Sequence, residues 1–124
     1  MRRLSFRKHQ HLRSGVDFDR VYALRCVARG SHLKVFGAPN QIDSLRVGFS
    51  VSKKHGNAVF RNRLKRLLRE AFRLSRHELP LGLDLVLIPV EARDVKLQDF
   101  RESLVLAASR VARKLERSQG TTSG

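Results

Sequence analysis

The sequence predicts a single small α+β domain whose elements follow the order helix, strand, strand, helix, strand, helix. The chain has 124 residues, a length at which one domain buries roughly two-thirds of the surface that its unfolded chain exposes. Its apolar residues recur every three or four positions in some runs and every second position in others, the spacings of helices and strands. The one cysteine, Cys26, excludes an internal disulfide, and no Cys/His cluster has zinc-site spacing, so burial alone must hold the core.

The N-terminal part of the chain predicts a basic arm followed by a short helix. Residues 2–13 are polar and aperiodic, which indicates an extended arm. An N-cap serine, an acid three residues later and side chains at helical spacing then predict a helix over 15–25: Ser14, Asp17, Phe18, Val21, Tyr22 and Arg25.

Two strands are predicted next, over 32–37 and 45–51. The first is rich in strand-forming residues and runs into a Gly-Ala-Pro-Asn turn that begins at Gly37. The second alternates apolar residues with small or polar ones, the pattern of a half-buried strand: Leu45, Val47, Phe49 and Val51 against Arg46, Gly48 and Ser50. We expect the two strands to form an antiparallel hairpin.

The main helix is predicted over 57–77. A basic turn at 52–56 precedes it, and Asn57 is placed as its N-cap. Its apolar residues form one stripe at about 100° per residue: Phe60, Leu64, Leu67, Leu68, Ala71 and Phe72.

A buried strand and a long helix complete the predicted domain. Residues 83–90 are almost continuously apolar, which predicts a strand buried on both faces, although Pro89 points to a sheet edge or a break in pairing. Apolar residues recur every three or four positions over 97–115 and predict the closing helix. The polar residues 118–124 predict a disordered tail, so the domain is expected to span 1–117.

The net charge of +15 is concentrated in two segments. Residues 46–76 hold ten Lys/Arg and one acid, and residues 1–35 hold nine Lys/Arg and two acids. Such a concentration is typical of proteins that bind nucleic acid, because each neutralised phosphate releases counterions. An anionic membrane is the competing partner, but the basic helix needs its apolar face for the core.

The longest apolar run, 85–90, is much shorter than the ~18 residues that span a bilayer, and no signal peptide is apparent. With its single cysteine, the sequence predicts a cytoplasmic protein that uses no membrane.

Cations and one asparagine line the face of the main helix opposite its apolar stripe. We call this set the basic ridge: Arg61, Asn62, Arg63, Lys65, Arg66, Arg69, Arg73 and Arg76. A solvated surface is the alternative interpretation. Such surfaces usually mix charges, however, whereas like charges four residues apart each cost a helix roughly 0.2–0.5 kcal/mol. Together with Lys53 and Lys54 of the basic turn, the ridge predicts phosphate binding at the start of the helix.

Two aromatic residues of the first helix, Phe18 and Tyr22, lie four positions apart. Core packing is the ordinary interpretation of such a pair. The alternative is a surface on which unpaired bases stack, each worth roughly 1–3 kcal/mol. Both hold if Phe18 is packed and Tyr22 lies at the rim, and Phe36 would extend the surface.

Residues for protein-based catalysis are not apparent. The five histidines show no triad or metal spacing, and the carboxylates are scattered rather than paired: His9, His11, His32, His55 and His77. Neither a Walker A loop nor a HExxH helix is present. We therefore expect no catalytic residue, metal site or small-molecule substrate in the protein itself.

The segment from Arg46 to Phe72 closely resembles the signature of the protein subunit of bacterial ribonuclease P. Its core, at 52–66, reads Ser-Lys-Lys-x-Gly-x-Ala-Val-x-Arg-Asn-Arg-x-Lys-Arg, a long and specific pattern. The likeness extends to residues 17–22 in the first helix, to the strand 84–88, and to the length and charge of the chain.

This resemblance implies a function. Members of the family join a large catalytic RNA, and the holoenzyme is an endonuclease that removes the 5′ leader from precursor tRNA by hydrolysis with RNA-bound Mg²⁺. By the same resemblance, the contacts to the catalytic RNA are Lys53, Lys54, Arg61, Asn62, Arg63, Lys65, Arg66 and Arg69. By the same resemblance, Phe18 and Tyr22 would line a cleft that holds the single-stranded leader, and Phe36, suggested above as an extension of this surface, is added to the expected leader contacts.

The resemblance also implies a fold, namely the ribosomal S5 domain 2-like fold. That fold has a mixed four-stranded sheet packed by helices and a left-handed β-α-β crossover, one strand more than the pattern above predicts. The sequence departs from the family at 88–91, where a basic residue often follows. An anion contact there stays open, with Arg93 as the candidate substitute.

Two other functions compete with the ribonuclease P subunit. A non-catalytic RNA-binding module of ribosomal or translation-factor type would share the fold and the charge. A protein-only nuclease is disfavoured because the sequence lacks metal ligands.

Overall fold

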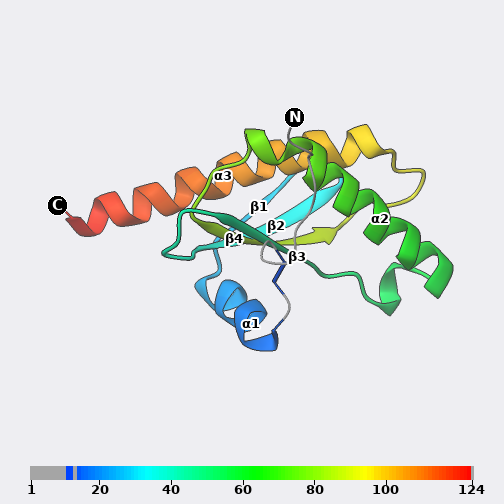
Figure 1. Cartoon of the computed structure of the whole chain (residues 1–124), viewed down its shortest axis with the longest axis horizontal. Coiled ribbons are helices and arrows are strands. Elements are labelled where there is room, and N and C mark those ends of the chain that lie inside the picture. The colour runs from blue at the N-terminus through cyan, green and yellow to red at the C-terminus, as the bar shows by residue number, and fades with distance from the viewer. Residues whose placement is uncertain (1–10, 13, 124) are drawn as a thin grey trace.

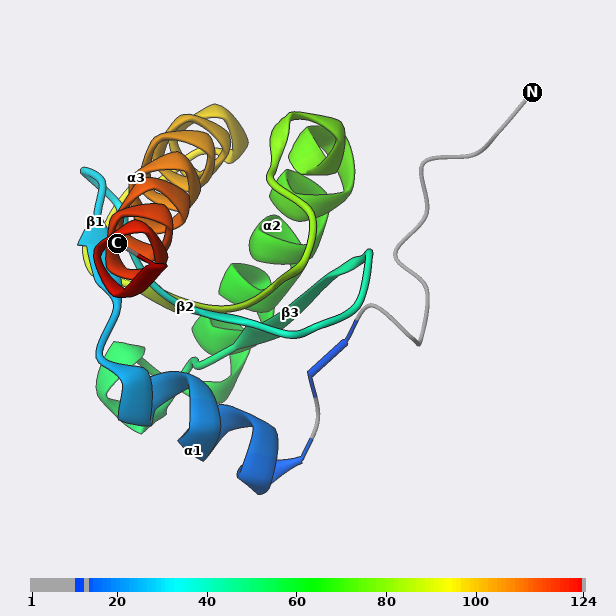
Figure 2. The same ribbon diagram turned by 90° about the vertical axis from the view of Figure 1, so that its left-hand side faces the viewer.

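The computed structural model describes residues 11, 12 and 14–123, which form one mixed four-stranded sheet with helices on both faces (Figures 1 and 2). The strands are β1 (Val27–Arg29), β2 (Leu33–Pro39), β3 (Leu45–Phe49) and β4 (Leu83–Pro89). Their order in the sheet is β1-β2-β4-β3. Strand β4 pairs antiparallel with β2 and parallel with β3.

Three helices cover the sheet: α1 (Gly15–Leu24), α2 (Ala58–Ser75) and α3 (Leu97–Ser123). Short 3₁₀ turns precede and follow α2, namely η2 (Lys53–His55) and η3 (Arg76–Glu78). Helices α2 and α3 lie side by side on one face and α1 lies on the other (Figure 2). Because α2 joins β3 to its parallel neighbour β4, it forms the β-α-β crossover of the sheet.

The predicted hairpin of 32–37 with 45–51 is wrong, because β4 lies between the two strands. Strand β4 is buried along almost its whole length, and the sheet centre is where a strand is covered on both faces and paired on both sides. The turn between β2 and β3 is instead bound to the start of β4. Gly82 accepts a hydrogen bond from the Asn40 amide (3.0 Å) and donates one to the Ser44 carbonyl (2.8 Å).

The fourth strand, β1, was not predicted from periodicity because it has only three residues. Of the two interpretations of Pro89, a sheet edge is wrong, whereas a break in pairing is confirmed because β4 and its pairing with β2 end at this residue. Pro89 is the last residue of the central strand and lies opposite Leu33 of β2, a terminal position where its missing N–H is tolerated.

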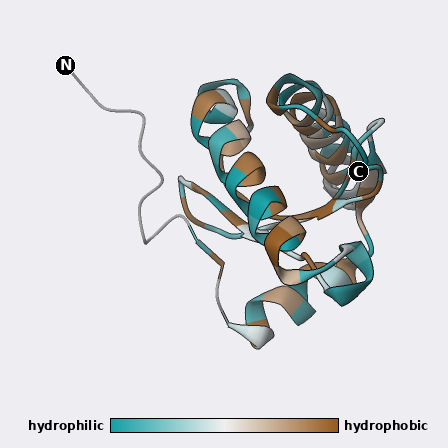
Figure 3. Ribbon diagram, turned by 90° about the vertical axis from the view of Figure 1, so that its right-hand side faces the viewer, coloured by the Kyte–Doolittle hydropathy of each residue, from teal (hydrophilic) through white to brown (hydrophobic). Residues whose placement is uncertain are grey.

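The main core lies between the sheet and helices α2 and α3. Its largest fully buried side chains come from all of these elements: Leu33, Leu64, Leu68, Phe72, Leu85, Leu87, Phe100 and Leu104. Hydrophobic and hydrophilic segments alternate along α2 (Figure 3), as its single apolar stripe predicts. A second, smaller core on the opposite face contains Leu12, Val21, Ala38 and Val86 beneath α1.

The sequence predicts an extended arm at the N-terminus and a disordered tail at the C-terminus, and the structure describes parts of both. His11 bridges to Val47 of β3 and Leu12 is buried, so these two residues of the predicted arm are extended; the rest of the arm, 1–10 and 13, lies outside the described residues. Helix α3 continues to Ser123, where the sequence predicts a disordered tail. The segment 118–123 contains no proline, and each residue added to an existing helix gains a hydrogen bond.

Candidate nucleic-acid interface

The basic turn before α2 is held against the end of β4 by His55. The Ser52 N–H donates to His55 Nδ1 at 2.9 Å, so Nδ1 is an acceptor and Nε2 carries the proton. Nε2 then donates to the Pro89 carbonyl at 2.9 Å. These bonds fix the turn while Lys53 and Lys54 stay exposed, and they give a role to a histidine for which the sequence suggested none.

Helix α2 begins where the sequence predicts. The Asn57 side chain accepts a hydrogen bond from the Phe60 N–H at 2.9 Å, which makes Asn57 the N-cap. The first turn contains no acidic residue. The partial positive charge of the helix start therefore adds to the charges of the basic turn.

The basic ridge lies on the outer side of α2. Asn62, Arg63, Arg66 and Arg69 are exposed, whereas Arg61, Lys65, Arg73 and Arg76 are half-buried. Residues two positions apart in the sequence are about 200° apart around the axis of an α-helix. Arg63 and Lys65 therefore lie on opposite flanks of α2, and the ridge is a broad basic surface rather than one row.

Two cations of the segment 46–76 already have acidic partners in the fold. Arg73 pairs with Glu70 on the same helix. Arg46 pairs with the buried Asp84 and so contributes little to the outward-facing charge. The basic surface therefore centres on the basic turn and the N-terminal three turns of α2.

The predicted aromatic residues come together between α1 and the sheet. The ring centroids of Phe18 and Tyr22 are 6.4 Å apart, and Phe36 of β2 meets Tyr22 edge to face at 5.0 Å. All three side chains are partly exposed. The Lys34 ammonium lies 5.3 Å from the centre of the Phe36 ring, which adds a cation to this surface.

Phe18 packs directly against strand β3. A Cβ atom added at Gly48 of β3 would come within 2.5 Å of the Phe18 ring, so the ring lies directly on the glycine backbone. Phe18 therefore anchors α1 to the sheet, and Tyr22 and Phe36 lie beside it.

A buried ion-pair network lies next to the aromatic surface and was not predicted. Arg46 Nε and Nη2 donate to the two Asp84 carboxylate oxygens at 2.8 and 2.7 Å, and Asn40 donates at 3.0 Å. Arg20 of α1 pairs with the same carboxylate. The sequence contained a signal for it, because an acid inside an apolar strand needs a partner.

The network sets the ionisation of Asp84. Burial on its own raises the pKa of this carboxyl, but hydrogen bonds from Arg46 and Asn40 and the charges of Arg46 and Arg20 outweigh burial and lower the pKa. Asp84 is therefore a structural anion that fixes α1 to the centre of the sheet.

Metal-ligand clusters and membrane-spanning helices are both absent from the described residues. Within 11, 12 and 14–123, no three His, Cys, Asp or Glu side chains gather as ligands for a metal ion. No helix in these residues has the length and apolarity needed to cross a membrane.

Comparison with known proteins agrees with the fold. The family model described as Ribonuclease P matches residues 6–112. The ribonuclease P protein component of Clostridioides difficile is 36% identical over 103 residues, which cover 82% of this chain and 90% of that protein. That of Finegoldia magna is 47% identical over 73 residues, covering 59% of this chain and 65% of that protein.

Solved structures give the same result. The ribonuclease P protein of Staphylococcus aureus superposes with a TM-score of 0.66 at 32% identity, covering 83% of this chain and 94% of that one. The protein from Thermotoga maritima gives 0.67 at 31% identity, with 77% and 91% covered. With a model match over most of its length and relatives of this similarity, the chain belongs to the ribonuclease P protein family.

Proposed function

We propose that this chain is the RNA-binding subunit of a ribonuclease P ribonucleoprotein, which cleaves the 5′ leader from precursor tRNA. The observation that carries the proposal is the basic turn joined to the exposed cations of α2, on a domain whose described residues contain no metal-ligand cluster. This surface would bind the catalytic RNA through Lys53, Lys54, Arg61, Asn62, Arg63, Lys65, Arg66 and Arg69.

The chemistry is assigned to the RNA partner and to Mg²⁺ bound there. The protein's contribution is electrostatic, because its cations lower the repulsion between two polyanions, the catalytic RNA and precursor tRNA. The aromatic surface on the other face of the sheet would hold the single-stranded leader, whose bases stack on Phe18, Tyr22 and Phe36.

The test is cleavage of 5′-labelled precursor tRNA at low Mg²⁺ by a bacterial ribonuclease P RNA, with and without the protein. We expect the protein to restore cleavage at the mature 5′ end and to cleave nothing when the RNA is omitted. Binding without any effect on cleavage by the cognate RNA would favour a non-catalytic RNA-binding module. Cleavage without RNA would indicate a protein-only nuclease.

Tyr22→Ala is expected to reduce the preference for precursor over mature tRNA. Loss of one base stack, roughly 1–3 kcal/mol, corresponds to a weakening of precursor binding by about five- to 150-fold, while mature tRNA has no leader to lose. Affinities of the assembled holoenzyme for both RNAs measure the effect. Tyr22→Phe keeps the ring and should retain the preference, and equal losses for both RNAs would leave Tyr22 only a packing role.

A further inference from the structure

A cavity of about 430 Å³ opens between the N-terminal half of α2, the basic turn and the loop from β4 to α3. This volume lies within the range of about 300 to 1,000 Å³ that is typical of small-molecule sites. The loop that closes it, 90–95, includes the stretch where the sequence departs from the family pattern.

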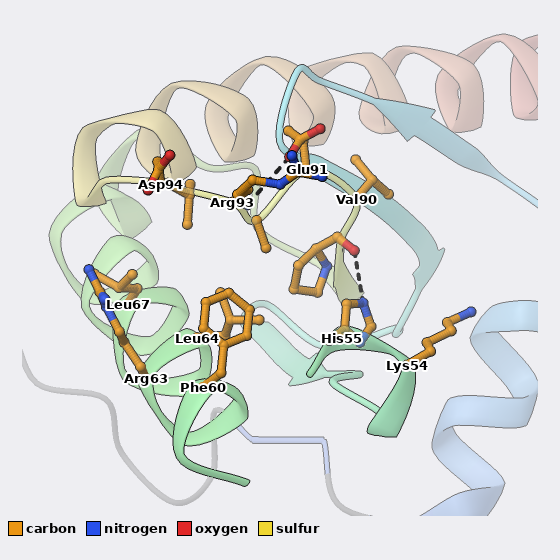
Figure 4. Close-up of a pocket in the computed structure, with 13 residues that line it drawn as sticks. Lys54, His55, Phe60, Arg63, Leu64, Leu67, Val90, Glu91, Arg93 and Asp94 are labelled. Atoms are coloured by element: carbon orange, nitrogen blue, oxygen red, sulfur yellow. Dashed lines mark hydrogen bonds between the residues drawn. The ribbon is translucent and has the colours of Figure 1, made fainter. Parts of the chain in front are cut away.

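The floor of the cavity is apolar. Phe60, Leu64 and Leu67 of α2 lie together on one side of the cavity (Figure 4), and Pro89 and Val95 also line it. The close seat of Phe60 depends on Gly56, which has φ of 140° and where a Cβ would lie 2.7 Å from the Phe60 ring. A flat apolar ring beside aliphatic side chains suits a planar aromatic ligand.

The rim of the cavity carries charges of both signs. Lys54 and Arg63 lie on opposite sides of the opening, and Glu91, Arg93 and Asp94 come from the loop (Figure 4). Glu91 is ordered by a hydrogen bond that Oε1 accepts from the Arg93 N–H at 3.3 Å. Two of the cations, Lys54 and Arg63, also belong to the RNA surface proposed above.

Given that proposed function, we propose that this cavity binds a single unstacked nucleotide of an RNA. The base would lie on the apolar floor against Phe60, and its phosphate would meet the cations of the rim. A base buried in this way leaves its polar edge facing Glu91 and Asp94, which accept hydrogen bonds but cannot donate them when ionised.

The carboxylates favour guanine among the four bases. Guanine presents two adjacent donors, N1–H and the N2 amino group, and so can bond both oxygens of one carboxylate, whereas uracil presents only N3–H. Charge-assisted pairs of this kind are stronger than neutral hydrogen bonds. The cavity is thus expected to select guanine over uracil.

The first test is a titration of the ¹⁵N-labelled full chain with guanosine 5′-monophosphate, followed by amide chemical shifts. We expect saturable shifts confined to residues 54–67 and 89–95, and weaker binding of uridine 5′-monophosphate by about tenfold, as loss of one charged hydrogen bond predicts. Equal binding of both nucleotides and of inorganic phosphate would mean a simple anion site and overturn the proposal. Shifts scattered over all basic surfaces would overturn it as well.

Variants then test the residues. Glu91→Gln removes the charge and keeps the shape, so it should abolish the preference for guanosine monophosphate over uridine monophosphate. Glu116→Gln, an exposed carboxylate on α3 outside the cavity, is the matched control and should leave that preference unchanged. A preference that survives Glu91→Gln and Asp94→Asn together would contradict the assigned role of the carboxylates.

The source of the nucleotide is tested with the pentaribonucleotides UUGUU and UUUUU. We expect UUGUU to shift the same residues as guanosine monophosphate and to bind more tightly than UUUUU. If the free nucleotide binds and UUGUU does not shift these residues, the cavity is a mononucleotide site and the RNA assignment is wrong. These titrations use the protein alone, so they can fail while the protein still supports cleavage in the precursor assay, which would count only against the nucleotide site. If the nucleotide binds as expected but the protein does not support cleavage, the result counts only against the proposed function.

Discussion

Arg63→Ala combined with Arg66→Ala is expected to weaken binding to ribonuclease P RNA by one to two orders of magnitude, about 1.5 kcal/mol or less for each exposed cation. Both side chains are exposed on the first turns of α2 beside the basic turn. Each neutralised phosphate releases counterions, so the slope of log K against log salt should become shallower by about 1.4 to 1.8 for two lost contacts. Filter binding or fluorescence anisotropy at four or more salt concentrations measures both quantities.

The matched control removes the same charge elsewhere. Arg113 and Arg117 lie on the C-terminal half of α3, where the neighbouring Lys114 and Arg110 bond carbonyls of β1. Strand β1 is at the opposite edge of the sheet from β3. Arg113→Ala with Arg117→Ala should therefore leave the slope close to that of the unchanged protein. An equal decrease in both double variants would mean that net charge, not the basic ridge, determines binding.

The sequence predicted helix α2 well because the helix depends on local rules. The apolar stripe, the N-cap at Asn57 and the spacing of the cations all belong to one helix, and the structure confirms the helix and its buried face. The role of a cation outside this helix was less predictable. Pattern alone treated Arg46 as one more surface cation, whereas pairing of β3 with β4 places it on Asp84.

Long-range pairing explains the other errors. Adjacent strands in the sequence favour a hairpin, yet β4, which follows 34 residues after the end of β3 by residue number, takes the place between β2 and β3. The same arrangement brings the loop 90–95 beside α2 and creates the cavity. Neither result follows from local periodicity, because both depend on which strand occupies the centre of the sheet.

The aromatic surface was predicted only in part from the sequence. The spacing of Phe18 and Tyr22 suggested both packing and stacking, and the structure gives a physical basis for both, with Phe18 seated on Gly48 and Tyr22 partly exposed beside Phe36. What the sequence could not supply is the anchor that holds α1 in place. That anchor is the bond of Arg20 to Asp84 and to the Pro39 carbonyl, 3.1 Å away.

Asp84→Ala is expected to destabilise the fold by about 3–5 kcal/mol, the usual cost of removing one partner from a buried ion pair. Asp84 is fully buried, and its loss leaves Arg46 without the carboxylate that accepts two of its hydrogen bonds. Urea unfolding at neutral pH measures the change. Asp43→Ala, an exposed acid in the turn between β2 and β3, is the control and should change stability by no more than about 0.5 kcal/mol.

The pH dependence gives a second, independent readout of the same network. The pKa of Asp84 is lowered in the folded protein, so its contribution to stability is present above the unfolded value of about 3.9 and is lost as the pH falls through the lower folded value. Asp84→Asn keeps the shape and cannot titrate, so its stability should fall less steeply than that of the unchanged protein as the pH decreases below about 5. Parallel acid profiles for the two proteins would show that the network does not control acid stability.

Because Arg20 ties α1 to the Asp84 carboxylate, the folded Asp84→Asn protein should also bind precursor tRNA with a reduced preference over mature tRNA. Such a result would link the buried Asp84 carboxylate to the aromatic surface beside it.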